Sequence, residues 1–410
     1  MKILHIVASL NPAMGGVAEA VKSFVSISEQ QSVCNEVVTL DPPGVDYLQS
    51  DVTPVHALGP SYGFLNHTRQ LIPWLTENIT RFDAIIINGL WGFHSYAAWK
   101  VIHRLKKNGS VKKVPSVFVM PHGMLDPYFQ RAKERRYKAL RNILYWAIVE
   151  RDVINDADGL LFTCETELLL ARETFKSYKP KKEYNVGYGI NTPPEYNRDM
   201  QLAFNQSCAG LTNEPYLLFL GRIDLKKGVD LLIKAYLKLQ EAAKITNTQL
   251  PKLVVVGPGL DTDFAKKILL DISRHPEVKD KIYFPGMLTG EAKWGAFYGC
   301  EAFVLPSHQE NFGIAVVEAM ACGKPVLISN QVNIWREISN GGAGIIEDDN
   351  LIGTESMLKQ WLNLTADEKL KMGKRATESF KKCFILDKSA SNMITVIQDT
   401  INERLSKLSN

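Results

Sequence analysis

The feature that most constrains the fold of this chain is a regular alternation of short apolar runs with segments of helical periodicity. The first run, residues 3–8, is continuously apolar, as is typical of a strand buried on both faces of a parallel sheet. Helical spacing follows over 17–27, and further apolar runs occur at 36–40, 83–88, 115–120 and 158–164. Strands that alternate with helices form βαβ units, so this region is predicted to be a doubly wound α/β domain.

The alternation stops at residues 191–213 and then begins again. This interval contains Pro193-Pro194 and an aperiodic polar stretch, so it is predicted to be a linker region. Apolar runs return at 216–220, 252–256, 281–284, 302–305, 325–328 and 343–346, and helical segments are expected at 351–364, 366–382 and 388–407. We therefore expect two Rossmann-like domains, over 1–190 and 214–384. Because such sheets bind ligands beyond the carboxyl ends of their strands, a site in the cleft between the domains is expected.

Composition narrows the class of protein. Hydrophobic residues make up 45% of the 410 residues and charged residues 22%, which is ordinary for a globular chain and excludes a collagen-like or disordered one. No apolar run reaches the length of about 18 residues that a transmembrane helix needs. The first residues become polar too soon for a secretion signal. The six cysteines are scattered without metal-ligand spacing, so we expect a cytoplasmic protein with reduced thiols.

The charge is unevenly distributed. The whole chain has a net charge of +4, yet residues 100–141 contain twelve lysines and arginines against two acidic residues. In the segment 128–148 the apolar residues share one helical face: Tyr137, Leu140, Leu144 and Ile148. Such a basic amphipathic helix can lie on an anionic membrane, which would place the protein peripherally at the inner face of the plasma membrane. The alternative is a helix whose apolar face packs on the core. Nucleic acid is not expected as a partner, because the rest of the chain is acidic and has no recognition motif.

The strongest motif surrounds two glutamates that lie eight positions apart. The apolar run 303–305 leads into a loop that carries Glu310, and Gly313 then opens a helix that carries Glu318. The first amides of a helix and its dipole favour a phosphate group. Glu310 can accept hydrogen bonds from sugar hydroxyls, and Glu318 can bind a ribose diol. The alternative is that both carboxylates are simply solvated.

Two further motifs place glycines and cations after predicted strands. Arg222 and Lys227 follow the run 216–220, where two cations suit a leaving diphosphate. The alternative there is a charged surface turn. Gly15-Gly16 follows the first strand and would let the backbone approach a ligand, although a plain turn is also possible.

Asp261-Thr262-Asp263 resembles a metal-binding triplet, but its position before a helix favours a helix cap.

Together these residues resemble the signature of GT-B fold retaining glycosyltransferases of family 4, the glycosyltransferase group 1 type, as found in bacterial polysaccharide synthesis. The resemblance includes Glu310 and Glu318, and also these segments: Gly221-Arg222, Lys226-Lys227-Gly228, Val256-Gly257-Pro258-Gly259 and 319–326. The close match covers about 215–346. The N-terminal half matches more loosely, through Gly15-Gly16 and His122-Gly123.

The resemblance implies two Rossmann-like sheets facing across a cleft, with the nucleotide sugar in the C-terminal domain and the acceptor in the N-terminal domain. It also implies that a C-terminal helix over 385–410 crosses back to the N-terminal domain. It assigns catalytic roles to His122, Arg222, Lys227 and Glu310, although a lone histidine is more often structural. Donor binding is assigned to Gly15, Gly16, Gly286, Leu288, Asn311, Phe312, Gly313, Ile314 and Glu318. No metal and no cofactor are implied.

The expected function is retaining transfer of a hexose from a nucleotide sugar to a hydroxyl of a saccharide or lipid-linked acceptor, in exopolysaccharide or cell-surface polysaccharide synthesis. UDP-glucose is the preferred donor. One alternative is a nucleotide-sugar 2-epimerase on the same fold, for which no acid/base motif is seen. Another is a non-catalytic nucleotide-sugar binding protein, which we would expect to lack Arg222, Lys227 or Glu310. A glycan phosphorylase would be longer and would carry a pyridoxal lysine motif.

Overall fold

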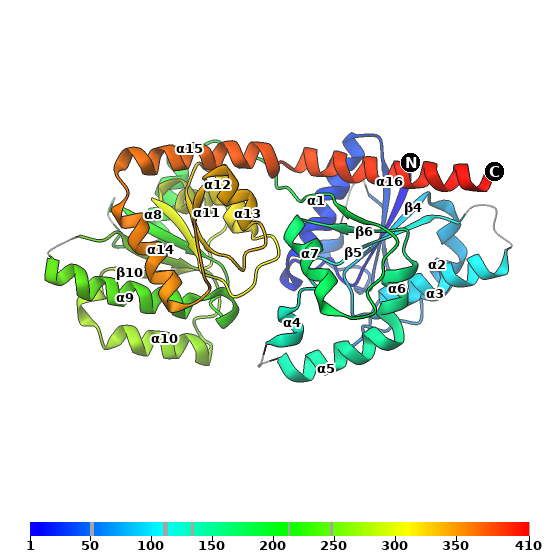
Figure 1. Ribbon diagram of the computed structural model, residues 1–410, viewed down its shortest axis with the longest axis horizontal. Helices are drawn as coiled ribbons and strands as arrows, with labels where there is room; N and C mark the ends of the chain where they lie inside the picture. The colour runs from blue at the N-terminus through cyan, green and yellow to red at the C-terminus, as the bar shows by residue number, and fades with distance from the viewer. Residues whose placement is uncertain (50–52, 110–113, 133–134, 212–213, 247–248, 410) are drawn as a thin grey trace. The chain divides into compact units, whose positions relative to one another are not determined.

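The computed structural model describes the chain except for residues 50–52, 110–113, 133–134, 212–213, 247–248 and 410 (Figure 1). It divides into two compact units. The first comprises Met1–Gly189 together with Leu386–Asn410, and the second comprises Ile190–Ile385. The final helix therefore belongs to the first unit, although almost two hundred residues separate it in sequence.

The first unit is built on a parallel sheet with seven strands in the described part of the chain. In spatial order these are β3 (Val55–Ala57), β2 (Cys34–Thr39), β1 (Lys2–Val7), β4 (Ala84–Asn88), β5 (Ser116–Met120), β6 (Gly159–Phe162) and β7 (Glu183–Asn185). Side chains alternate between the two faces of each strand. Ile85 and Ile87 therefore pack into one apolar core, whereas Ile86 and Phe118 pack into the other.

Helices cover both faces of this sheet. They are α1 (Gly16–Gln30), α2 (Leu71–Asn78), α3 (Phe93–Asn108), α4 (Tyr128–Arg131), α5 (Arg136–Tyr145), α6 (Arg151–Asp156), α7 (Glu165–Thr174) and α16 (Leu386–Ser409). A π-helical segment, Trp146–Glu150, joins α5 to α6. Helix α16 packs on α1 and places Met393 and Ile397 in the same core as Ile86. This packing holds the C-terminal segment in the first unit.

The second unit is built on a parallel sheet whose described strands number six. In spatial order they are β10 (Ile282–Gly286), β9 (Lys252–Val256), β8 (Tyr216–Leu220), β11 (Ala302–Leu305), β12 (Val326–Ser329) and β13 (Gly344–Glu347). The helices are α8 (Arg198–Ser207), α9 (Val229–Thr246), α10 (Asp263–Ser273), α11 (Gly290–Gly299), α12 (Ile314–Ala321), α13 (Trp335–Gly341), α14 (Leu351–Asn363) and α15 (Ala366–Cys383).

The predicted linker at 191–213 was wrong where the structure forms helix α8. Asn197 caps this helix through its side chain, and Met200 and Phe204 are buried on one face. Helix α8 packs against α11 so closely that a Cβ on Gly295 would overlap the carbonyl oxygen of Met200. The helix has only two large buried side chains on its inner face, which explains why its periodicity is weak in the sequence. Residues 212–213 of this interval lie outside the described residues.

Both sheets have the doubly wound order that the sequence predicts. Each order reverses direction between two neighbouring strands, β1 and β4 in the first unit and β8 and β11 in the second. Ligands of such folds bind beyond the carboxyl ends of the strands at this reversal. In the described chain, none of the helices combines the length and the hydropathy needed to cross a membrane.

Candidate functional site

The loops that follow β8 and β11 are joined at the reversal point of the second sheet. His308 N and Ser307 Oγ each donate to the carbonyl oxygen of Lys226, both at 2.8 Å. Gly228 has a φ of +67°, and a Cβ there would overlap the carbonyl oxygen of Pro306. Only glycine satisfies both conditions easily, so this residue fixes the close approach of the two loops.

Lys227 and Glu310, which the sequence singled out separately, form an ion pair across these loops. Their side chains are each 17% exposed. The backbone of Glu310 is held in turn by the loop after β12, because Glu310 N donates to Gln331 O and Asn333 N donates to Glu310 O, both at 2.9 Å. The arrangement presents a lysine and a carboxylate of fixed position at the carboxyl edge of the sheet.

Arg222 lies at the end of β8 with its side chain 69% exposed. Its guanidinium is 3.5 Å from Asp224, a loose contact in a solvated setting. Such an exposed pair is worth little, so the guanidinium can turn toward an incoming anion at small cost. Arg222 and Lys227 thus place two cations after the same strand.

Helix α12 begins at the motif that carries Glu310. Gly313 is its N-cap, with a φ of +76°, and no side chain caps the helix. The first turn has no acidic residue. Asn311 accepts a hydrogen bond from Asn333 Nδ2 at 3.3 Å, and the buried Phe312 packs edge-on against Phe384. The amide of Ile314 therefore opens a helix whose positive end is available to an anion.

Glu318 lies in α12 and is nearly buried, at 8% exposed. Its carboxylate accepts a hydrogen bond from Lys293 Nζ of α11 at 2.6 Å. Sequence reasoning missed Lys293, since nothing in the chain relates it to a glutamate 25 positions further on. The lysine thus holds the carboxylate in place at the carboxyl end of the sheet.

Three glycines line the carboxyl edge of neighbouring strands. Gly221 N donates to Val256 O at 3.0 Å, and Gly257 N donates to Gly286 O at 2.8 Å. A Cβ on Gly257 would overlap the carbonyl oxygen of Gly221. After Gly286 the chain exposes Met287 and buries Leu288. Backbone groups rather than side chains form this part of the edge.

In the first unit, Gly15 adopts a φ of +107° and Gly16 starts α1. Open space surrounds the position that a Cβ of Gly15 would occupy, so the backbone angle rather than crowding requires glycine. Asp41, which sequence reasoning missed, organises the preceding turn. Its carboxylate accepts hydrogen bonds from Leu10 N at 2.7 Å and from Ser9 Oγ at 2.6 Å.

His122 follows β5 with a φ of +51° and contacts a residue that the sequence did not single out, Asn88 at the end of β4. The Nε2 of His122 lies 3.2 Å from Asn88 Oδ1, and Asn88 Nδ2 donates to Ile86 O at 3.2 Å. The amide is therefore oriented so that His122 Nε2 carries the proton. Burial lowers the pKa of His122 to about 4, so the ring is neutral at neutral pH and its Nδ1 is an acceptor.

Two buried glutamates hold the loops that follow β4, β5 and β6 of the first unit. Glu167 accepts from Gly123 N at 2.5 Å and from Thr163 N at 2.7 Å. Glu150 lies in the π-helical segment and is fully buried. Its Oε1 accepts from Trp91 N and Ser95 Oγ, both at 2.7 Å, and burial raises its pKa to about 7. No sequence motif indicated either glutamate, because Gly123, which Glu167 binds, and Trp91, which Glu150 binds, are distant in the chain.

The triplet Asp261-Thr262-Asp263 opens α10, as its position predicted. The cap is Thr262, whose side chain accepts from Ala265 N at 3.2 Å, rather than an aspartate. Asp263 is almost fully exposed and forms an ion pair with Lys266. The triplet therefore serves the start of a helix.

The predicted basic helix of 128–148 is present but divided into α4, α5 and the π-helical segment. Helix α5 buries Ala139 and Asn142. The apolar face that runs from α5 into the π-helical segment is exposed, with Tyr137 at 94% and Ile148 at 75%. The alternative in which this face packs on the core was wrong, because the smaller residues face inward. Lys133 of the segment lies outside the described residues.

Comparisons with known proteins relate part of this chain to a known family. Residues 206–379 match the family model described as glycosyl transferases group 1. The chain is 28% identical over 239 residues to a D-inositol 3-phosphate glycosyltransferase of Gordonia bronchialis, a match covering 56% of this chain and 50% of that protein. The matches span about half the length of the curated relatives.

Solved structures match the described fold over nearly its whole length. Sucrose-phosphate synthase from Thermosynechococcus elongatus has a TM-score of 0.72 at 19% identity, covering 98% of this chain and 99% of that one. Anabaena HepE in complex with UDP and glucose has a TM-score of 0.68 at 16% identity, covering 99% and 100%. The predicted GT-B fold is confirmed by these neighbours.

Proposed function

We propose, from the premise that residues 206–379 form a glycosyl transferases group 1 domain, that this chain transfers a hexose from a nucleotide sugar to an acceptor hydroxyl. The acceptor oxygen forms a bond to the anomeric carbon as the bond from that carbon to the diphosphate breaks. The acceptor proton passes to the leaving phosphate. The configuration at the anomeric carbon is retained.

The observation that carries this proposal is the grouping of Arg222, Lys227, Glu310 and the start of α12 at one strand edge. A diphosphate that takes up the charge of Lys227 would release Glu310 to accept hydrogen bonds from the sugar. Arg222 and the helix dipole would share the charge that develops on the leaving group. These groups supply the compensation that a metal gives elsewhere, so we propose metal-independent transfer without a cofactor.

The remaining donor contacts follow from the same edge. Glu318 would bind the ribose diol, and the backbone between Gly286 and Leu288 would face the base. In the first unit, neutral His122 would accept a hydrogen bond from a sugar hydroxyl through Nδ1, and Gly15 and Gly16 would offer backbone amides. The first unit would also hold the acceptor.

We propose UDP-glucose as the donor and a saccharide or lipid-linked acceptor in cell-surface polysaccharide synthesis. The UDP and glucose bound by Anabaena HepE support this choice of donor. The similarity to a protein named as a D-inositol 3-phosphate glycosyltransferase supports the reaction type.

Calorimetric titration with UDP and with GDP, in EDTA, tests the donor site. We expect UDP to bind wild type, and Arg222→Ala to weaken binding at least roughly tenfold, because a hydrogen bond to a charged group is worth about 1.5–3 kcal/mol. Arg274→Ala is the matched control. Its side chain is 66% exposed and 3.2 Å from an aspartate, close to the setting of Arg222.

The outcomes separate the alternatives. Binding of neither nucleotide would refute the donor site, and binding that requires added Mg²⁺ would refute metal independence. A binding protein would hold UDP-glucose without turning it over in the presence of an acceptor pool. A 2-epimerase would convert the sugar of UDP-glucose without any acceptor.

The exposed apolar face of α5 supports a second proposal, peripheral binding to an anionic membrane. Arg136, Lys138 and Arg141 lie on the same short helix as that face. An exposed apolar stripe beside cations suits the boundary between lipid headgroups and acyl chains. This position would bring the enzyme to a lipid-linked acceptor. Co-sedimentation with vesicles tests this proposal. We expect the protein to sediment with phosphatidylserine vesicles, but not with neutral vesicles, at low salt.

A further inference from the structure

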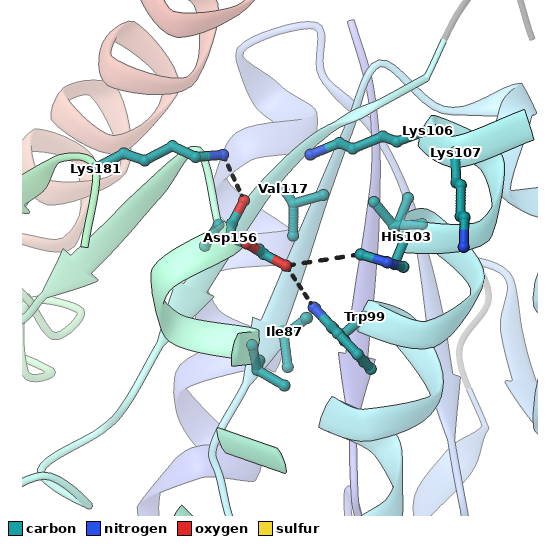
Figure 2. A pocket seen from close by; sticks show the side chains of 11 residues that line it. Ile87, Trp99, His103, Lys106, Lys107, Val117, Asp156 and Lys181 are labelled. Atoms are coloured by element: carbon teal, nitrogen blue, oxygen red, sulfur yellow. Dashed lines mark hydrogen bonds and ion pairs between the residues drawn. The ribbon is translucent and has the colours of Figure 1, made fainter. Parts of the chain in front are cut away.

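The first unit contains a cavity of about 500 Å³ between helices α3 and α6 (Figure 2). Its floor is apolar and comes from Ile87 of β4, Ile102 of α3, Val117 of β5 and Val153 of α6. Small-molecule sites in proteins span about 300–1,000 Å³. A water molecule occupies about 30 Å³ in the liquid, so the cavity is much larger than a single ion needs.

This cavity is separate from the residues assigned to transfer. Ile87 and Val117 belong to the core on one face of the sheet. His122 instead borders a small cavity with Ile86 and Met120, which point to the opposite face. The sheet itself therefore lies between the two regions. A ligand in the larger cavity would not occupy the place of the sugar.

Two lysines face one another over the apolar floor. Figure 2 shows the ammonium groups of Lys106 and Lys181 directed toward each other beside Val117. Lys181 donates to the backbone oxygen of Asp156 at 2.7 Å and lies 3.4 Å from Asp158. Among the described residues the ammonium of Lys106 has no hydrogen-bond or ion-pair partner. Desolvation lowers the pKa of Lys106, and Lys181 and Arg404 add to this effect, whereas the charges of Asp158 and Asp156 oppose it.

The one carboxylate that lines the cavity is already engaged. Asp156 Oδ2 accepts from Trp99 Nε1 at 2.8 Å and lies 3.8 Å from His103 Nδ1. In Figure 2 both contacts direct the carboxylate toward Trp99 and His103 rather than toward Lys106. The rim of the cavity thus has an excess of positive charge.

Compensation of the helix dipole does not explain this arrangement by itself. Lys106 and Lys107 lie in the last turn of α3, where cations are favoured. That preference requires no cavity and no cation from another segment. Lys181 comes from the segment before β7, and its ammonium reaches the same rim.

We propose that this cavity binds an amphiphilic anion, with a phosphate or carboxylate head between Lys106 and Lys181 and an alkyl chain on the apolar floor. The anion would give the Lys106 ammonium the hydrogen-bond partner that the described part of the chain does not offer it. The alkyl chain would fill the volume that an inorganic ion leaves empty, because apolar surface is driven from water.

Calorimetric titration of the full chain with octyl phosphate tests the proposal, with inorganic phosphate and octanol as comparison ligands. We expect octyl phosphate to bind at one site, and both comparison ligands to bind at least roughly tenfold more weakly. Lys106→Met should weaken octyl phosphate roughly tenfold, and Lys106→Arg should restore most of the binding.

Lys138→Met is the matched control, since Lys138 is an exposed lysine beside the apolar face of α5. Thermal unfolding of each variant shows whether it is folded. Binding weakened by Lys138→Met and not by Lys106→Met would place the ligand on α5 and overturn the proposal. Equal affinity for inorganic phosphate would reduce the cavity to a simple anion site and would also overturn it. Absence of octyl phosphate binding to folded wild type would do the same.

Discussion

Replacing Ile148 by serine removes an apolar side chain from the exposed face of the basic segment. Ile148 is 75% exposed, so its removal takes away few contacts within the protein. Isoleucine and serine have similar helix propensities, and the fold should therefore be little affected. If the face enters a membrane, however, the variant loses the burial of this side chain in lipid.

The magnitude follows from the exposed fraction. Full burial of an isoleucine contributes about 1.5–3 kcal/mol, and about three quarters of this side chain remains to be buried. The expected loss is about 1–2 kcal/mol, or roughly 5–30-fold in vesicle partition. The affinity of wild type should also fall with added salt, because the flanking cations act through the anionic surface.

The assay is co-sedimentation with phosphatidylserine vesicles at low salt, over a range of lipid concentrations. Ile352→Ser is the control, because Ile352 lies on α14 of the second unit and is 81% exposed. It should partition as wild type does. Equal partition of wild type and both variants would show that the exposed apolar face of the basic segment does not enter lipid, and the reasoning would be refuted.

Two further predictions concern single side chains. Lys227→Met should lower kcat by roughly 10²–10³, because the variant loses a contact to the charge that develops on the leaving group. Lys234 is an exposed lysine on α9, and Lys234→Met should leave kcat unchanged. Similar kcat values for the two variants would contradict the role of Lys227. Glu150→Gln should change how stability depends on pH. Burial raises the pKa of Glu150 from 4.5 to about 7, so the folded state binds its proton more tightly than the unfolded state does. The tighter proton binding stabilises the folded state fully below pH 4.5, and this contribution is lost as the pH rises through 7. The total loss in the free energy of unfolding is up to about 3 kcal/mol. Urea unfolding of wild type and variant should show this difference growing between pH 5 and pH 8, and a constant difference would exclude the shifted pKa.

Much of the fold was predictable because its signals are local. The continuous apolar runs, such as that of β1, identified buried parallel strands, and the doubly wound order followed from their alternation with helices. The prediction was wrong at α8, where only Met200 and Phe204 anchor a mostly polar helix. A pattern of two residues does not stand out against a polar background.

The candidate site was partly predictable for the same reason. Arg222, Lys227 and Glu310 each follow an apolar strand, and residues in that position meet at one edge of a parallel sheet. The residues that hold them did not stand out. Asn88 beside His122, and Lys293 beside Glu318, come from segments whose own sequence carries no sign of the partner.

The sequence by itself determined the two α/β domains, the places where their strands end and the charged residues that follow them. These depend on periodicity and short motifs, which neighbouring residues along the chain specify. Only the tertiary structure decided that Lys227 pairs with Glu310, 83 positions away, and that the small residues of α5 face inward while Tyr137 and Ile148 face solvent. It also decided that two lysines from separate segments border one apolar cavity. Each of these depends on which distant surfaces pack together, and packing is a property of the whole folded chain rather than of any one segment.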